Sequence, residues 1–329
     1  MSTTWFVTGA SGGLGLEIAR QALAEGDNVV ATADDPRAVS DALGAHGVGA
    51  GDRALVLGLN VDDRSQARAV VDRALERFGR IDVLVNGASR GLVGAVEETS
   101  DAEARVLFDT NVFGLLNVTR AVLPAMRAAR SGTVVNVSPV GGRVGRAGWG
   151  VDCATRFAVQ GLTEALALEL APLGVRVTTV EHGPLRTDCL DGSAPCHAAT
   201  VIGDYTATSG ESRVRARAGG RARVGDPVRA AQVVLAAVRG ASLPMRLPLG
   251  SAVVEDIGAR LVATAGILGD RSEAALSVDL PDVGRAGVAA RRQRAGRFSE
   301  PAPAAASRFA AQSARARSFS SDGEPVSAV

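Results

Sequence analysis

Lysine is absent from this chain of 329 residues, so all 36 basic residues are arginines. Tyr205 is the single tyrosine, and there are only three cysteines. An odd and sparse cysteine set without a secretory leader favours free thiols and a reducing compartment, and we expect the protein in the cytoplasm. A net charge of +1 gives no field that would attract nucleic acid, and no run of about 18 uncharged apolar residues predicts a membrane span.

The first 180 residues alternate short apolar runs with segments of helical periodicity. Apolar runs continuous enough for buried strands occupy residues 4–7, 28–33, 54–59, 81–85, 133–137 and 175–180, and helices are expected at 14–24, 64–78, 101–130 and 152–170. Strands joined through helices must run parallel, and their Val- and Leu-rich composition indicates burial on both faces. The predicted fold is therefore an α/β, doubly wound, Rossmann-like parallel sheet.

The periodicity fades over residues 181–224, and a loop of this length is usually functional. We expect it to bind the substrate, a small molecule that the pattern does not identify. A helix at 226–239 and an edge strand at 243–249, limited by two prolines, follow. Residues 1–255 thus form the predicted domain, 256–280 an extension of uncertain packing, and 281–329, rich in Ala, Arg, Ser and Pro, a disordered tail.

Glycines cluster directly after the first expected strand, in Thr8-Gly9-Ala10-Ser11-Gly12-Gly13-Leu14-Gly15. A helix opens there, so its free N–H groups and the positive end of its dipole point toward the turn. A tight turn alone would explain isolated glycines, but strand, glycine turn and helix in a βαβ unit predict a dinucleotide site. The turn residues expected at the cofactor are Gly9, Ser11, Gly13, Leu14 and Gly15.

The glycine spacing resembles that of the short-chain dehydrogenase/reductase family, and the likeness extends over residues 3–255. Asn60-Val61 is similar to the family's adenine-contacting Asp-Val. The segment 82–89, with Asn86, resembles its D-x-L-V-N-N-A-G, and Asn111 matches a helix Asn that supports a relay water. His182-Gly183-Pro184-Leu185-Arg186-Thr187 is similar to a segment whose Thr meets the nicotinamide. The resemblance implies an NAD(P)-binding oxidoreductase.

The catalytic positions depart from the family pattern. The spacing of its Ser, Tyr and Lys places these roles on Pro139, Asp152 and Arg156. Ser138 lies one residue early, so its side chain is expected on the other face. Asp152 and Arg156, one helical turn apart, favour a salt bridge over an acid–base pair. Carbonyl reduction by the usual route is therefore expected to be impaired or replaced by altered chemistry.

Other residues offer weaker candidates for chemistry. His182 would place an imidazole near the nicotinamide end of the pocket, where it and Asp152 could exchange protons near neutral pH, although a packing role is the simpler explanation. His182, Cys189, Cys196 and His197 match no compact zinc spacing, so no metal is expected. Cys153 reads as a small buried apolar residue and Tyr205 as a loop packing residue.

Asp34 and Asp35 follow the second strand, and two carboxylates there would repel a 2′-phosphate, which favours NAD over NADP. Asp34 is the expected ribose contact, although the resemblance puts that role at position 33. Two functions remain open. The chain is either an enzyme using Asn111, Asp152, Arg156 and His182, or a non-catalytic partner subunit or nucleotide-binding regulator. Homo-oligomers through the helices at 101–130 and 152–170 are expected from the resemblance.

Overall fold

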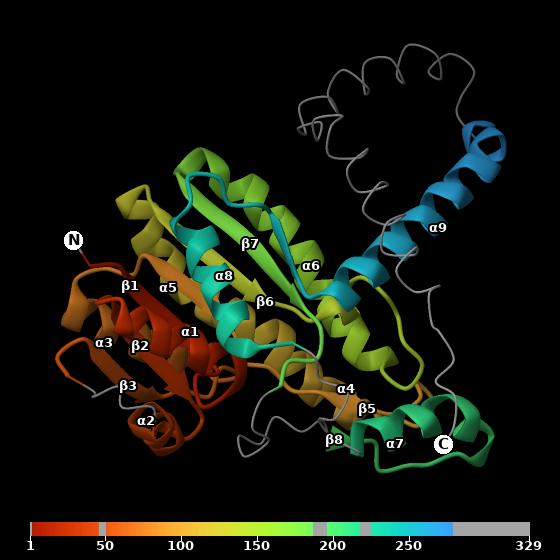
Figure 1. Ribbon diagram of the computed structural model, residues 1–329, viewed down its shortest axis with the longest axis horizontal. Helices are drawn as coiled ribbons and strands as arrows, with labels where there is room; N and C mark the ends of the chain where they lie inside the picture. Colours follow the sequence, from red (N-terminus) through yellow and green to blue (C-terminus); the bar gives the residue numbers. More distant parts are fainter. Residues whose placement is uncertain (1, 46–50, 187–195, 218–224, 279–329) are drawn as a thin grey trace, which may run out of the picture. The chain divides into compact units, whose positions relative to one another are not determined.

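The computed structural model describes residues 2–45, 51–186, 196–217 and 225–278. Its main sheet has seven parallel strands in the order β3-β2-β1-β4-β6-β7-β9 (Figure 1). The strands are β1 (Thr4–Thr8), β2 (Asn28–Ala33), β3 (Ala54–Gly58), β4 (Val83–Asn86), β6 (Gly132–Val137), β7 (Val175–His182) and β9 (Arg246–Leu249). The doubly wound sheet predicted from the sequence is confirmed, and β9, which contains Pro248, lies at an edge as expected.

Helices cover both faces of this sheet. Buried side chains of α1 (Gly13–Ala24), α2 (Pro36–Ala45) and α8 (Pro227–Arg239) form one core cluster with the strands. Those of α3 (Arg64–Phe78), α5 (Leu115–Ala129) and the end of α6 (Gly150–Leu170) form the other. The strand order reverses direction between β1 and β4, so the carboxyl ends of these two strands open a crevice in which ligands of such folds bind.

The helix expected at 101–130 is interrupted. α4 (Asp101–Phe108) passes into a π-helical segment, η1 (Asp109–Gly114), which continues into α5. Extra residues of this kind are frequent at functional sites, and this one contains Asn111. By length and composition Asp101–Ala129 could cross a membrane, but half of its most apolar stretch is buried in the fold, as for a core helix.

Two parts of the structure differ from the sequence-based expectation. The loop expected over 181–224 contains β8 (Cys196–His197), which pairs with β5 (Leu92–Val93), and α7 (Glu211–Arg217). Helix α2 was not predicted either. In both places the pattern is too short for local periodicity, and long-range packing decides the structure.

The end of the predicted domain falls inside a helix. α9 extends over Ser251–Leu276, while the chain divides into compact units at Val262 and Ala263. The predicted disordered tail, 281–329, lies outside the described residues.

Candidate active site

The glycine turn between β1 and α1 is shaped for close approach of a ligand. Gly9 and Gly13 have φ of 68° and 58°, a region that favours glycine. A Cβ on Gly9 would lie 2.8 Å from the Ala88 nitrogen, and one on Gly15 would overlap the Gly9 carbonyl oxygen. Thr8 holds the two sides together, because its hydroxyl accepts hydrogen bonds from the backbone N–H groups of Gly87 and Ala88.

The first turn of α1 has no capping side chain among the described residues, and its N-cap, Gly12, is extended. A helix start of this kind leaves N–H groups without partners, and an anion satisfies them. Ser11 and Gly13 are partly exposed at this turn, whereas Leu14 is buried beneath it. The residues present therefore fit the pyrophosphate of a dinucleotide.

The residues predicted near the adenosine lie on both sides of the groove. Asp34, directly after β2, is exposed, and Arg90, beyond the end of β4, reaches within 3.8 Å of its carboxylate. Asn60 is exposed and Val61 is buried, with its side chain against the backbone of Gly114. This arrangement gives an open polar end to the groove.

The side chain of Asn86, one of the predicted cofactor residues, is engaged by its neighbours. The Asn86 side chain is buried and donates to Thr119 Oγ1 and Asn136 Oδ1, so only its backbone can face the groove. Thr187 lies outside the described residues. The signal for Asn86 came from the motif alone, which cannot distinguish a ligand contact from a buried amide network.

Asn111, Asp152 and Arg156 are brought together by hydrogen bonds. Asn111 accepts from the Arg90 backbone N–H at 2.8 Å and donates to the Arg90 carbonyl at 3.0 Å and to Thr155 Oγ1 at 3.0 Å. Arg156 Nη2 donates to the same Arg90 carbonyl at 2.9 Å and contacts Asp152 Oδ1 at 3.4 Å. The backbone of Arg90 thus connects the π-helical segment to α6.

The predicted ion pair between Asp152 and Arg156 is present and buried, with 11% and 6% of the side chains exposed. Burial raises the pKa of Asp152, and the Arg156 charge opposes this rise without cancelling it. Residue types alone leave open whether burial or Arg156 decides the Asp152 pKa, and in the structure burial is the larger cause. A carboxyl with a raised pKa is a better proton donor than an exposed one.

His182 ends β7 and lies close enough to Arg156 for that charge to act on it. Burial lowers the pKa of His182, and the Arg156 charge lowers it further, so the imidazole is neutral at pH 7. Its Nδ1 lies 2.7 Å from the Gly183 carbonyl oxygen, so Nδ1 carries the proton and donates it there. Nε2 is left as a proton acceptor.

Ser138 and Pro139 leave the expected serine position without a hydroxyl. Ser138 is fully buried, and its Oγ lies close to Gly142 and has no partner within the described chain. Pro139 is partly exposed.

Cys153 and Tyr205 stay outside the hydrogen-bonded set. Cys153 is buried, and burial raises the pKa of its thiol, as suits a packing residue. The Tyr205 hydroxyl donates to Glu97 Oε2 at 2.6 Å, and this carboxylate raises its pKa. Neither group is placed to donate a proton in the pocket.

A buried ion pair attaches α7 to Glu98, in the loop between β5 and α4. Arg213 Nη2 donates to Glu98 Oε2 at 2.6 Å, with 8% and 0% of the side chains exposed. The Glu98 carboxylate also accepts from the backbone N–H groups of Ala95 and Ile202. Burial would raise the pKa of Glu98, but these hydrogen bonds and Arg213 outweigh it and lower the pKa.

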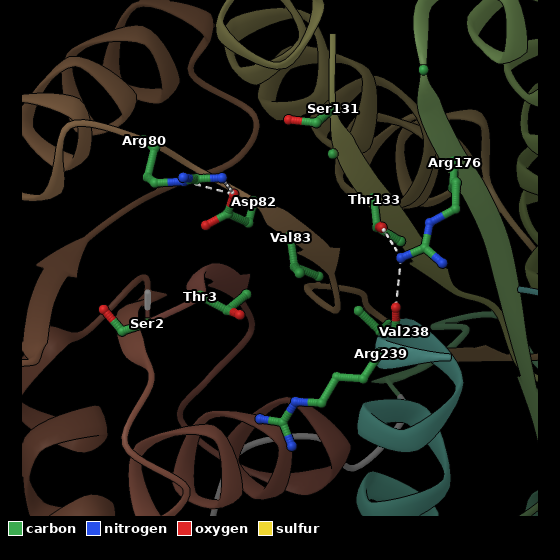
Figure 2. Close-up of a pocket in the computed structure, with 12 residues that line it drawn as sticks. Ser2, Thr3, Arg80, Asp82, Val83, Ser131, Thr133, Arg176, Val238 and Arg239 are labelled. Carbon is green, nitrogen blue, oxygen red and sulfur yellow. Dashed lines mark hydrogen bonds and ion pairs between the residues drawn. The ribbon is translucent and has the colours of Figure 1, made fainter. Parts of the chain in front are cut away.

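A cavity of about 460 Å³ lies at the amino ends of the strands, away from the crevice. Figure 2 shows two of its arginines engaged with neighbouring groups: Arg80 with Asp82, and Arg176 with Thr133 and the Val238 carbonyl. The third, Arg239, donates to Asp27 Oδ2 at 2.7 Å. Since ligands of doubly wound sheets bind at the carboxyl ends, and these arginines are already paired, this cavity is no candidate active site.

Comparison with known proteins gives the class. Residues 3–195 match the family model for short chain dehydrogenase. Oxidoreductase BOA17 of Botryotinia fuckeliana is 35% identical over 258 residues, which cover 78% of this chain and 92% of that protein. The chain therefore belongs to the short-chain dehydrogenase/reductase family of oxidoreductases.

Solved structures agree. A short-chain dehydrogenase from Streptomyces avermitilis is 37% identical, with a TM-score of 0.79, and the match covers 85% of this chain and all of that one. A metagenomic short-chain oxidoreductase in complex with NADP is 27% identical, with a TM-score of 0.59, over 76% of this chain and 97% of that one. The resemblance seen in the sequence motifs is thus confirmed.

Proposed function

We propose that this chain binds NAD(P)H and interconverts a carbonyl and an alcohol on a small molecule, with Asp152 in place of the family's tyrosine. The observation that carries the proposal is the position of Asn111, Asp152, Arg156 and His182 at the carboxyl ends of the strands, beside an uncapped glycine turn. An oxidoreductase needs these two parts together, because the cofactor and the proton-transfer groups must meet at one substrate.

When bound, NAD(P)H supplies a hydride to the carbonyl carbon. The chain must then supply a proton to the carbonyl oxygen. Asp152 is the candidate donor because burial raises its pKa, and Arg156 stabilises the carboxylate left after transfer. In the reverse direction, the Asp152 carboxylate takes the proton back from the alcohol, because the two directions share one transition state. Nε2 of the neutral His182 is a second proton acceptor close to Arg156. A carboxyl whose raised pKa is opposed by an arginine carries its proton less often at neutral pH than a tyrosine does, so we expect slow turnover.

Cofactor preference, location and assembly are also proposed. Asp34 and Asp35 oppose a 2′-phosphate, which supports a preference for NADH over NADPH. The sparse free cysteines support a cytoplasmic location, and Cys153 and Cys196 are free thiols. The exposed apolar side chains of Val106, Phe113 and Phe157, on α4, η1 and α6, support homo-oligomer formation.

The test of the proposed chemistry is NADH oxidation with a panel of aldehydes and ketones, comparing the wild type with Asp152→Asn. The variant keeps the shape of the side chain but has no acidic proton, and we expect its turnover to fall by about 10² to 10⁴. As a control, the cofactor dissociation constants of the wild type and the variant are measured and should be equal. Full activity in Asp152→Asn would remove Asp152 from the mechanism.

One observation favours a second function. The Arg156 guanidinium is buried against Asp152 and the Arg90 carbonyl. These contacts engage the side chain that would otherwise bind the ribose. A non-catalytic subunit or nucleotide-binding regulator would retain the cofactor groove with its catalytic positions held in this way. Saturable cofactor binding with no turnover on any carbonyl substrate would favour that function.

A further inference from the structure

Arg90 spans the nucleotide groove. It follows the end of β4, and its Nη2 lies 3.8 Å from Asp34 Oδ2, which follows the end of β2. Since β1 lies between β2 and β4 in the sheet, a contact between these two residues must pass over the carboxyl end of β1. The guanidinium therefore lies over the crevice and next to the carboxylate expected at the adenosine ribose.

The backbone of Arg90 is fixed, while its side chain remains accessible. Asn111 binds both its N–H and its carbonyl, and Arg156 donates a second hydrogen bond to that carbonyl. The side chains of Arg90 and Asp34 are 49% and 69% exposed. An exposed ion pair of this kind contributes little to stability and is easily exchanged for a better partner.

Acidic groups surround this end of the groove. Asp34 and Asp109 both raise the pKa of Asp62, whose burial is the largest cause of the rise, and the Arg90 charge lowers it. Asp34 by itself would repel a ligand that carries a phosphate beside it. Arg90 supplies that cation from the opposite side of the groove, and a guanidinium can pair with a phosphate through two parallel hydrogen bonds.

We propose that Arg90 is a cofactor-selectivity residue that binds the 2′-phosphate of NADPH after releasing Asp34. This inference rests on the proposed binding of NAD(P)H. Arg90 then limits the preference for NADH that Asp34 and Asp35 create, so NADPH remains a usable cofactor. NADH carries no 2′-phosphate, and its binding leaves the Arg90 contact unused.

The experiment compares dissociation constants of NADH and NADPH, measured by calorimetry, for the wild type, Arg90→Gln and Arg90→Lys. Adenosine 2′,5′-bisphosphate and 5′-AMP serve as fragments that differ only in the 2′-phosphate. We expect Arg90→Gln to weaken NADPH and the bisphosphate about tenfold, as for loss of a charge-assisted hydrogen bond, with NADH and 5′-AMP unchanged within twofold. Arg90→Lys should retain most of the NADPH affinity.

The matched control is Arg37→Gln, because Arg37 is exposed and follows Asp34 and Asp35 on the β2 side of the groove. A selective loss of NADPH in Arg37→Gln but not in Arg90→Gln would overturn the proposal. Equal loss of NADH and NADPH in Arg90→Gln would also overturn it, because the guanidinium would then contact a part common to both. If the wild type binds neither cofactor, the proposed function fails rather than the role of Arg90.

Discussion

Replacing Arg213 by methionine should loosen residues 199–217, because Arg213 on α7 attaches this segment to Glu98. Methionine preserves much of the apolar stem but leaves the Glu98 carboxylate, which is fully buried, without its counter-ion. Breaking one side of a buried ion pair costs about 3 to 5 kcal/mol. Two backbone N–H groups still satisfy Glu98, so we take the lower end, about 3 kcal/mol, or roughly a 150-fold rise in the opening equilibrium.

Native-state hydrogen exchange measures this quantity directly, because it reports the opening free energy of the amides in residues 199–217 separately from global unfolding. The matched control is Arg215→Met on the same helix. The pair of Arg215 with Glu211 is exposed, with 77% and 57% of the side chains accessible, so its loss should cost about 0.5 kcal/mol or less. Equal protection in the two variants would refute the reasoning.

The double variant Glu98→Gln/Arg213→Met separates the ion pair from packing. It removes both buried charges, and such replacements are often neutral, so it should recover more than half of the loss seen in Arg213→Met. The Nε of Arg213 has no partner in the described part of the chain, which further lowers the value of the native pair. A loss of stability in the double variant larger than the sum of the two single-variant losses would contradict the role of the ion pair.

Three further predictions concern the groove, the assembly and pH. Gly9→Ala should abolish measurable NADH binding, because its Cβ would meet the Ala88 backbone at 2.8 Å, while Gly26→Ala, also at positive φ but with open space around it, should lose only about 1 kcal/mol by urea unfolding. Phe157→Glu should shift the light-scattering mass from oligomer to monomer and Val201→Glu, also exposed but outside the helix faces, should not; a monomeric wild type would contradict this. Because burial raises the pKa of Asp152, carbonyl reduction should fall as pH rises through that pKa, above its ordinary 3.8, and a rate independent of pH in single-turnover measurements would contradict a donor role.

The fold could be predicted because its determinants are local. Each buried strand is a continuous apolar run, and the glycine turn lies between a strand and a helix that adjoin it in the sequence. The same approach failed over 196–217, where Glu98 and Arg213, 115 positions apart, hold the segment in place. A pattern read along the chain cannot show a partner that far away.

The candidate site was predicted in its residue types but not in its contacts. Spacing alone placed Asp152 and Arg156 one turn apart, and their ion pair is present. Burial, which decides the direction of the Asp152 pKa, depends on packing from several elements and was not predictable. Arg90 was missed altogether, because nothing in the sequence shows that its side chain crosses the sheet toward Asp34.

The crevice between β1 and β4 is the proposed binding site of a nicotinamide dinucleotide. Binding there is measured by titrating the purified protein with NADH and following the fluorescence of Trp149 at the start of α6. We expect saturable quenching that Gly9→Ala abolishes. No saturable change and no heat of binding at millimolar NADH or NADPH would contradict the account.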